Sequence, residues 1–513
     1  MNENKTTYGN PIHSNHYELL SKLVSVSKKI SAEQNTGNLL NMILQECMMI
    51  TNSDAGSIYI KVPMNDIDYL QFTVTKNDSI SINFKKKLIP VNFDSIAGYT
   101  ALSGEVFTFN NMNDVITSLG ISHDNSFDQK SKYKTMNMLS LPMKNIKNEV
   151  IGVMQLINKK IDANSVISDK SLYSESIVPY TKEEANIVAS LSSQAAILLE
   201  RSKLYSDINL LFETFAETLV TSLDQRDPST AGHSTRVSQM SINLAHAVNN
   251  STSRAFSLVA FSEYEIKELF FAALLHDIGK IGVREHVLLK SSRLSKSEIE
   301  VLKYKFMCLE LLLKEKGRHC TLSNSERITL DSIDQYFKFI LSINYKGFIT
   351  DQEIELLNEI NRISYIDENG VTKIELLPPN ILESLSIRKG NLTKSERAAI
   401  EDHAVFTEQV LREIAWTSEL KNVPNIAANH HERIDGTGYP KGLIGANILI
   451  QSRIISIADV YDAMTASDRP YKTAVPIEKA LSILRTEAKN NGLDHDLVEL
   501  FISEKAYNIE NRW

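Results

Sequence analysis

The feature that most constrains the fold is a long stretch, residues 181–224, that contains neither glycine nor proline. Its apolar residues recur near heptad spacing; they are Ile187, Leu191, Leu198, Tyr205, Ile208, Phe212, Phe215 and Leu219. This spacing predicts one continuous helix with an apolar stripe, which favours parallel pairing with a second copy of the chain. Pro228 ends the pattern. We therefore expect a signalling or coiled-coil linker helix over residues 181–226, between two folded regions.

The size and charge of the chain limit its class. A chain of 513 residues is too long for one core, and 42% hydrophobic with 23% charged residues is typical of globular proteins. No apolar run reaches the roughly 18 residues of a membrane span, and the polar N-terminus has no signal-peptide core, so we expect a cytoplasmic protein without membrane association. The net charge of -8 argues against nucleic acid as the main partner.

The region before the linker helix has the pattern of an α+β domain. Residues 1–17 are expected to form a disordered tail, and the apolar spacing over residues 17–50 predicts two helices. Strand-like runs follow: SIYIKV, YLQFTV, VFTF, MLSLPM and VIGVMQLIN. We expect an antiparallel sheet framed by helices.

This order, together with GYTALSGEVFTFNNM and SLPMKNIKNEVIGVMQLINKK, resembles a GAF domain over about residues 18–165. The resemblance implies a sensory domain with a small-molecule ligand. GAF domains that bind cyclic nucleotides often carry Asn-Lys followed by Phe-x-x-x-Asp-Glu. Asn158 and Lys159 match the first element, but the second could only be Tyr180 with Glu184 and Ala185. We favour dimerisation or another ligand.

Residues that carry chemistry gather after the linker helix. Asp277 continues an apolar helical face, and a buried carboxylate needs a cation beside it. Nitrogen and oxygen ligands on separate helices suit two borderline transition metals, which can activate water for attack on phosphorus. The candidate ligands are five histidines and two carboxylates: His233, His276, Asp277, His403, His430, His431 and Asp459.

Three motifs here resemble the HD-GYP family of phosphohydrolases. They are HDIGK at His276, HHERIDGTGYP at His430, and DVYDA with RPYK between Asp459 and Lys472. The resemblance covers about residues 225–510 and implies an all-α domain whose best-known substrate is cyclic di-GMP.

The family pattern also implies a role for each matching residue. One metal would be held by His233, His276, Asp277 and Asp459, and the other by His403, His430 and His431, with Asp277 bridging. Asp277 and Lys280 would be catalytic, with Lys280 at a phosphate or the nucleophilic water. Tyr439 would contact the nucleotide, and Arg469 with Lys472 would hold the phosphodiester. The metals would be Fe or Mn, with Zn as an alternative.

The chain departs from the family pattern at several points. Ser229 stands where members with a third metal carry glutamate, so we expect two metals. The segment HAVFT at His403 lacks the usual proline and later glycine, and one extra residue separates Asp459 from Arg469.

A near-repeat in the sequence explains why His403 lies so far after His276 in the chain. RLSKSEIEVLKYKF and NLTKSERAAIEDHAVF both contain a capping box and should both start helices. The first copy stands at the ordinary family spacing but carries Lys305, and a protonated amine has no lone pair for a metal. The sequence therefore predicts a mostly helical insert over about 305–390, after which the second copy supplies His403.

Taken together, the sequence predicts a homodimeric GAF-regulated enzyme that hydrolyses cyclic di-GMP to pGpG and further to GMP. One alternative is the same chemistry on another cyclic dinucleotide or phosphoester. Another is a cyclic di-GMP-binding or scaffolding protein with weak turnover. Whether the insert gates or blocks the site stays open.

Overall fold

The computed structural model describes residues 36–65, 67–80, 88–112, 114–115, 120–121, 133–167, 176–227, 232–366, 373–466 and 474–509. The chain divides into two compact units, Met1–Leu211 and Phe212–Trp513. The predicted tail and the first predicted helix lie outside the described residues. Within the described parts, no helix is long and apolar enough to cross a membrane.

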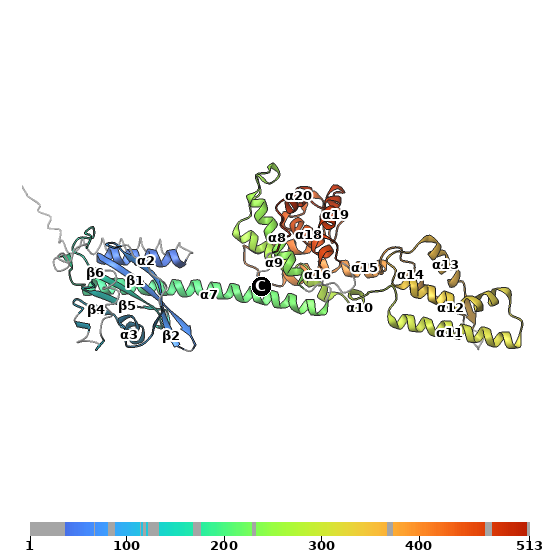
Figure 1. Ribbon diagram of the computed structural model, residues 1–513, viewed down its shortest axis with the longest axis horizontal. Helices are drawn as coiled ribbons and strands as arrows, with labels where there is room; N and C mark the ends of the chain where they lie inside the picture. The colour runs from blue at the N-terminus through green and yellow to red at the C-terminus, as the bar shows by residue number, and fades with distance from the viewer. Residues whose placement is uncertain are drawn as a thin grey trace, which may run out of the picture. The chain divides into compact units, whose positions relative to one another are not determined.

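The N-terminal unit is built on a six-stranded antiparallel sheet in the order β3-β2-β1-β6-β5-β4 (Figure 1). The strands are β1 (Ser53–Met64), β2 (Ile67–Asn77), β3 (Leu88–Pro90), β4 (Phe107–Phe109), β5 (Met138–Lys144) and β6 (Val150–Lys159). Because successive side chains alternate between faces, Ile58 packs with helix α2 (Thr36–Thr51), whereas Tyr59 packs with α3 (Ile96–Ser103). The predicted sheet with framing helices is confirmed.

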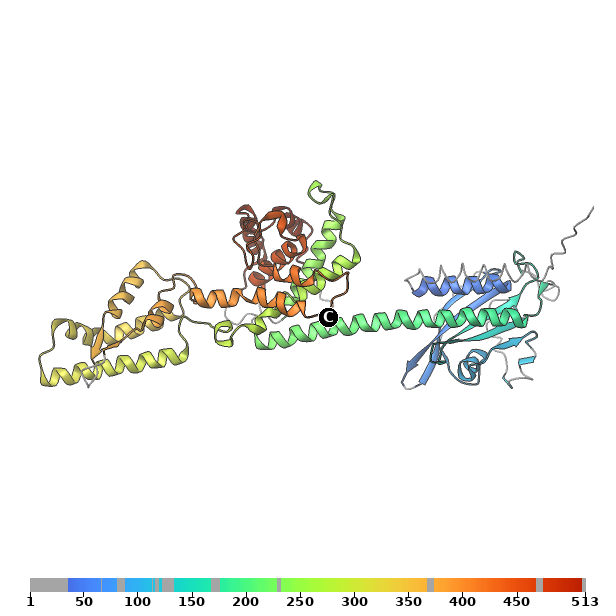
Figure 2. The same ribbon diagram turned by 180° about the vertical axis from the view of Figure 1, so that it is seen from behind.

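The linker helix α7 runs from Lys182 to Arg226 as one uninterrupted helix. Its first part packs on the sheet face that α2 also covers, through Val188, Leu191 and Ala195 (Figure 2). The predicted long helix is therefore confirmed.

The residues weighed for a cyclic-nucleotide motif make contacts inside the N-terminal unit. The Asn158 side chain accepts from the Met136 amide at 2.8 Å. Lys159 Nζ lies 2.6 Å from Glu184 Oε2, and this ion pair fixes the end of β6 to the first turn of α7. Tyr180 shares a hydrogen bond of 2.9 Å with Ser53.

The C-terminal unit has a helical core. Its helices are α8 (His233–Asn250), α9 (Glu263–Leu274), α10 (Glu285–Leu288), α15 (Lys394–Glu401), α16 (His403–Arg412), α17 (Val423–Ala428), α18 (Ile450–Thr465), α19 (Ile477–Lys489) and α20 (His495–Ser503), with a 3-10 turn η4 (Ile278–Gly282). One buried cluster includes residues of α8, α9, η4 and α16 to α20, and Val237, Leu269 and Ile457 are fully buried within it.

The insert has its own hydrophobic core, which includes Leu302, Phe306 and Ile340. It contains α11 (Lys296–His319), α12 (Asn324–Asn344), α13 (Asp351–Asn361) and α14 (Pro379–Leu385), visible as a separate group in Figure 1. This core begins at Leu294, before the expected start near 305, because the helix of the first copy packs with the insert. Within this mostly helical insert, β7 (Ser364–Ile366) and β8 (Lys373–Glu375) form a small antiparallel sheet.

Candidate metal centre

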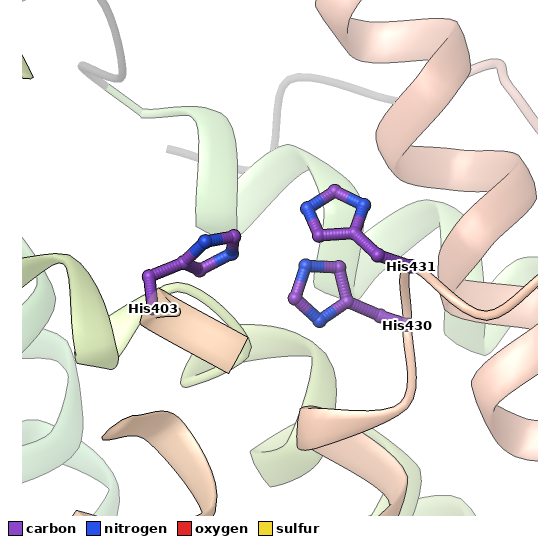
Figure 3. Close-up of side chains that lie close together, drawn as sticks. All are labelled: His403, His430 and His431. Carbon is purple, nitrogen blue, oxygen red and sulfur yellow. The ribbon is translucent and has the colours of Figure 1, made fainter. Parts of the chain in front are cut away.

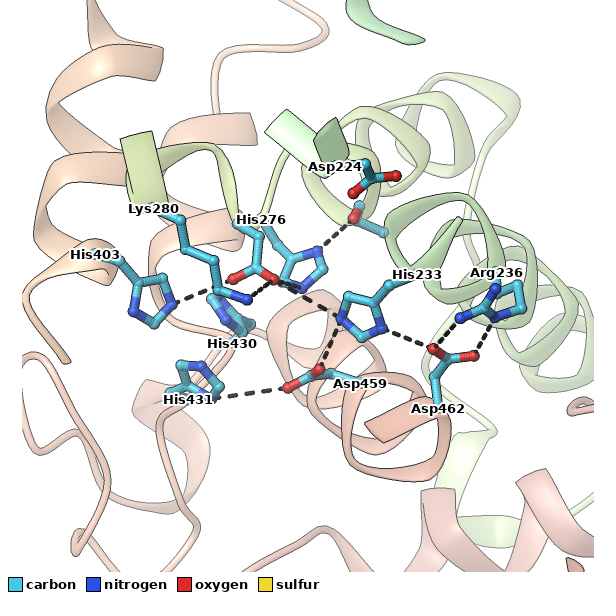
Figure 4. Close-up of polar contacts among 12 residues, drawn as sticks. Asp224, His233, Arg236, His276, Lys280, His403, His430, His431, Asp459 and Asp462 are labelled. Atoms are coloured by element: carbon cyan, nitrogen blue, oxygen red, sulfur yellow. Dashed lines mark hydrogen bonds and ion pairs between the residues drawn. The ribbon is translucent and has the colours of Figure 1, made fainter. Parts of the chain in front are cut away.

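The predicted ligands converge from the ends of several helices (Figure 4). His233 and His403 are the first residues of α8 and α16. His276 and Asp277 lie in the turn between α9 and η4, and His430 directly follows the C-cap of α17. All seven predicted ligands are brought together, although their roles stay predictions.

Three of the histidines use the same local contact. Nδ1 donates to the backbone oxygen three residues earlier, from His276 to Ala273 at 2.8 Å. His403 donates to Ile400, and His430 to Ala427, each at 2.6 Å. Because a carbonyl oxygen can only accept, Nδ1 carries the proton and Nε2 keeps a lone pair.

The three Nε2 atoms are buried and have no hydrogen-bond partner in the described parts of the chain. A buried polar atom is costly to leave unpaired, so repeated exceptions at one place need an explanation. Three lone pairs aimed into one site are a donor set for a cation.

The ligand atoms form two groups. His403, His430 and His431 form one (Figure 3), and His233, His276 and Asp277 form the other; within each, the atoms lie within 4.8 Å of one another.

Asp277 stands between these groups. Its Oδ2 lies 3.4 Å from His276 Nε2 and 3.8 Å from His233 Nε2, and its Oδ1 lies 3.4 Å from His403 Nε2. One oxygen therefore faces each group, as a bridging carboxylate requires.

A second carboxylate, Asp459 on α18, also faces both groups. Its Oδ1 lies 3.2 Å from His233 Nε2, and its Oδ2 lies 3.9 Å from His431 Nδ1. The predicted assignment of Asp459 to the group of His233 agrees with the shorter of these distances.

Lys280 lies beside Asp277, with its Nζ 2.7 Å from Asp277 Oδ2. Burial alone would raise the pKa of Asp277, but the charge of Lys280 and the neighbouring imidazoles of His276 and His403 hold it well below its usual range. Asp277 is therefore ionised and available as a ligand at neutral pH.

The imidazoles are tuned in opposite directions. Burial lowers the pKa of His430 well below its usual value and that of His431 to about 4, so both are neutral near pH 7. Burial also acts to lower the pKa of His233, but hydrogen bonds with Asp459 and Asp462 outweigh it and raise this pKa to about 9. His233 therefore carries a proton at pH 7 and would release it on binding a metal, whereas the neutral nitrogens of His430 and His431 and the anionic oxygens already fit divalent transition-metal ions.

Asp462 and Arg236 lie behind His233 and support it, and neither belongs to the predicted ligand set. His233 Nδ1 donates to Asp462 Oδ2 at 2.7 Å. Arg236 holds the same carboxylate through Nε at 2.6 Å and Nη2 at 2.9 Å. A carboxylate behind a ligating histidine fixes the ring and strengthens it as a donor. The spacing could have indicated Asp462, because it lies three residues after Asp459 on one helix.

The predicted substrate residues have different outcomes. The Tyr439 ring lies 4.7 Å from the His431 ring, centroid to centroid, at the edge of the second group. Buried Glu432 fixes the following turn by accepting from the Lys441 and Leu443 amides at 2.7 and 2.8 Å. Arg469 and Lys472 lie outside the described residues.

The first copy of the repeat makes its contacts within the insert. Lys305 Nζ donates to the backbone oxygen of Glu375 at 3.1 Å. It is therefore not part of the ligand cluster, whereas the second copy leads directly into His403.

The fold and site define a helical domain with a candidate metal centre, joined by a long helix to an α+β domain. Two family models match the chain, described as GAF domain over residues 35–199 and HD domain over residues 370–497. The chain thus carries a GAF domain followed by an HD domain, as its motifs predicted. The HD match begins within the insert. It therefore includes His403 and Asp459, but His276 lies before its first residue.

Similar curated proteins include two from Vibrio cholerae serotype O1. The "3'3'-cGAMP-specific phosphodiesterase 3" is 44% identical over 97 residues, covering 19% of this chain and 20% of that protein. The "Cyclic di-GMP phosphodiesterase" is 32% identical over 163 residues, covering 31% of each. The chain thus spans less than a third of either relative. A crystal structure of residues 122 to 287 of a methyl-accepting chemotaxis protein is 13% identical, with a TM-score of 0.28, covering 35% of this chain and 98% of that chain.

Proposed function

We propose that this chain is a metal-dependent phosphodiesterase that hydrolyses cyclic di-GMP to pGpG, and further to GMP, under control of its GAF domain. The observation that carries the proposal is the set of three unpaired buried imidazole nitrogens beside an ionised carboxylate that faces two ligand groups. The names of the two relatives support a cyclic dinucleotide as substrate. The name of the first relative also favours 3'3'-cGAMP as an alternative substrate, hydrolysed by the same chemistry.

The proposed centre holds two divalent ions, Fe or Mn with Zn as the alternative. His233, His276, Asp277 and Asp459 would hold one, and His403, His430 and His431 the other. When bound, such ions activate water and polarise the phosphoryl oxygen.

The remaining roles belong to the side chains around the ligands. Lys280, held beside Asp277, would contact a phosphate oxygen or the attacking water. Tyr439 would contact a base of the dinucleotide, and Arg469 with Lys472 would neutralise the phosphodiester. Cations placed around a phosphoryl group stabilise the charge that grows in the transition state.

The end of α7 supports the proposed control. The Gly232 amide, beside His233, donates to Asp224 Oδ2 at 2.9 Å. Arg226 donates to the backbone oxygens of Ile281 at 2.6 Å and Val283 at 2.9 Å, just after Lys280. A shift or rotation of this helix would therefore act on the backbone beside both predicted ligand segments.

We also propose that the protein is a cytoplasmic homodimer. Its three cysteines are free, and Cys308 and Cys320 are exposed, which suits a reducing compartment. The middle of α7 exposes Leu204, Ile208 and Leu211 at coiled-coil spacing, and a second copy of the helix would cover them.

The test is a hydrolysis assay of Mn²⁺-loaded protein with cyclic di-GMP and 3'3'-cGAMP. The proposal predicts linear product from wild type and from Asp331→Ala, a surface control, but none from Asp277→Ala. Faster turnover of 3'3'-cGAMP would favour the alternative substrate. Tight binding without product would support a scaffolding protein, and product from Asp277→Ala would exclude the proposed site.

A further inference from the structure

The first turn of α16 lies directly on the backbone of the HDIGK segment. Gly279 has no side chain, and a Cβ there would lie 2.0 Å from the His403 carbonyl oxygen and 2.4 Å from the Thr407 amide nitrogen. No real Cβ fits at these distances. The two segments that supply ligands to different groups therefore touch through their main chains.

Thr407 joins these segments through its hydroxyl group. It lies four residues after His403 on α16, so both side chains occupy the same face of the helix. Its Oγ1 donates to the His276 backbone oxygen at 2.9 Å and accepts from the Gly279 amide at 3.0 Å. The side chain is fully buried. One hydroxyl thus pairs a donor and an acceptor on either side of Asp277.

HAVFT departs from the family pattern at the predicted ligand His403, and Thr407 is its last residue. The substrate and metal roles above leave Thr407 unused.

We propose that Thr407 is a positioning residue that sets the separation between the two ligand groups. Asp277 Oδ1 and His403 Nε2 are 3.4 Å apart, so a small shift of α16 changes how the carboxylate can bridge. Without the hydroxyl, the Gly279 amide and the His276 carbonyl lose a partner that no water can readily replace in a closed contact. This inference rests on the proposed two-metal centre.

The test compares Mn²⁺ binding to wild type, Thr407→Val and Thr407→Ser. Valine keeps the volume and removes the hydroxyl, whereas serine keeps the hydroxyl. We expect Thr407→Val to bind its second Mn²⁺ about 10–100-fold more weakly, the usual effect of losing a supporting contact around a metal. Thr407→Ser should bind both ions as wild type does. The electron paramagnetic resonance signal of the coupled Mn²⁺ pair should be lost in the valine variant at metal concentrations that saturate wild type.

Equal binding and an unchanged coupled signal in Thr407→Val would overturn the inference, whatever its melting temperature. Should the valine variant not fold, Thr407→Ala and Thr407→Ser decide, because both lose the methyl group and only serine keeps the hydroxyl. A wild type that binds fewer than two ions would instead contradict the proposed function.

Discussion

At the scale of single residues, the candidate centre depends on which imidazole nitrogen carries the proton. His276, His403 and His430 each follow a turn whose carbonyl oxygen takes the Nδ1 proton. The HDIGK and HHE motifs predicted which residues gather here. The tautomers could not be predicted, because they depend on where each helix ends. The spacing indicates Asp462 as a nearby carboxylate but not its partner His233, since the two residues are 229 positions apart in the chain.

Replacing Asp462 with asparagine tests the support behind His233. Loss of the charge removes one of the two hydrogen-bonded carboxylates that raise the pKa of this histidine to about 9, so its pKa should fall. Metal affinity should fall by about 10–100-fold. Nuclear magnetic resonance titration of the metal-free protein and Mn²⁺ binding would measure both. Asp331→Asn serves as the control, and an unchanged His233 pKa would contradict the assigned contact.

Gly279→Ala tests the main-chain contact below the centre. The added methyl group collides with the His403 carbonyl oxygen, and overpacking of this kind costs about 1–3 kcal/mol or more. The midpoint of urea unfolding can be followed by the fluorescence of Trp416, because the Trp416 side chain packs against the core of the C-terminal unit. The control is Gly317→Ala in the insert, where the nearest atom is 3.5 Å away and no loss is expected. Equal midpoints for the two variants would show that the close approach is wrong.

At the scale of elements, Arg293 joins segments of the insert that are far apart in the sequence. This buried guanidinium donates to the backbone oxygens of Ile343 at 2.7 Å, Ile387 at 3.0 Å and Lys346. Lys290 then pairs with Glu396 at 2.7 Å, which ties the chain just before Arg293 to the helix before His403. The capping boxes made the helix starts predictable. The sheet of β7 and β8 was not, because strands of three residues carry too little pattern.

The capping box of α13 should make the insert sensitive to acid. Hydrogen bonds from Lys346 and the Thr350 amide lower the pKa of Glu353 from 4.5 to about 2. As the pH falls below about 4.5, the unfolded chain takes up this proton first, so the contribution to stability is lost between about 4.5 and 2. Urea unfolding followed by circular dichroism at pH 7, 4 and 3 should show a shallower decline for Glu353→Gln. Parallel declines would contradict the assigned contacts.

At the scale of the whole molecule, α7 links the two units, and its exposed apolar residues account for the predicted dimer. Periodicity sufficed to predict this helix within a residue or two, because no glycine or proline interrupts it. The partner of α7 cannot be derived from contacts within a single chain. The separate core of the insert was likewise only partly predictable, since its first helix carries the same start signal as the helix before His403.

The dimer proposal predicts that a charge in the stripe separates the protomers. Ile208→Glu places a carboxylate at an exposed apolar position of α7, and desolvating it in a pair of helices is costly. Sedimentation should show a monomer for this variant and a dimer for wild type. Lys203→Glu, at an exposed position of the same helix outside the stripe, should remain dimeric. A monomeric wild type would end this proposal.

In the proposed two-metal centre, His403 follows the insert and completes the ligand set, a role that Lys305 cannot take. The most direct measurement is the number of Mn²⁺ ions bound per chain by wild type, His403→Ala and Lys305→Ala. We predict about two, one and two ions, because an imidazole offers a lone pair at neutral pH and a protonated amine does not. Two ions bound to His403→Ala, or a loss in Lys305→Ala, would contradict this prediction.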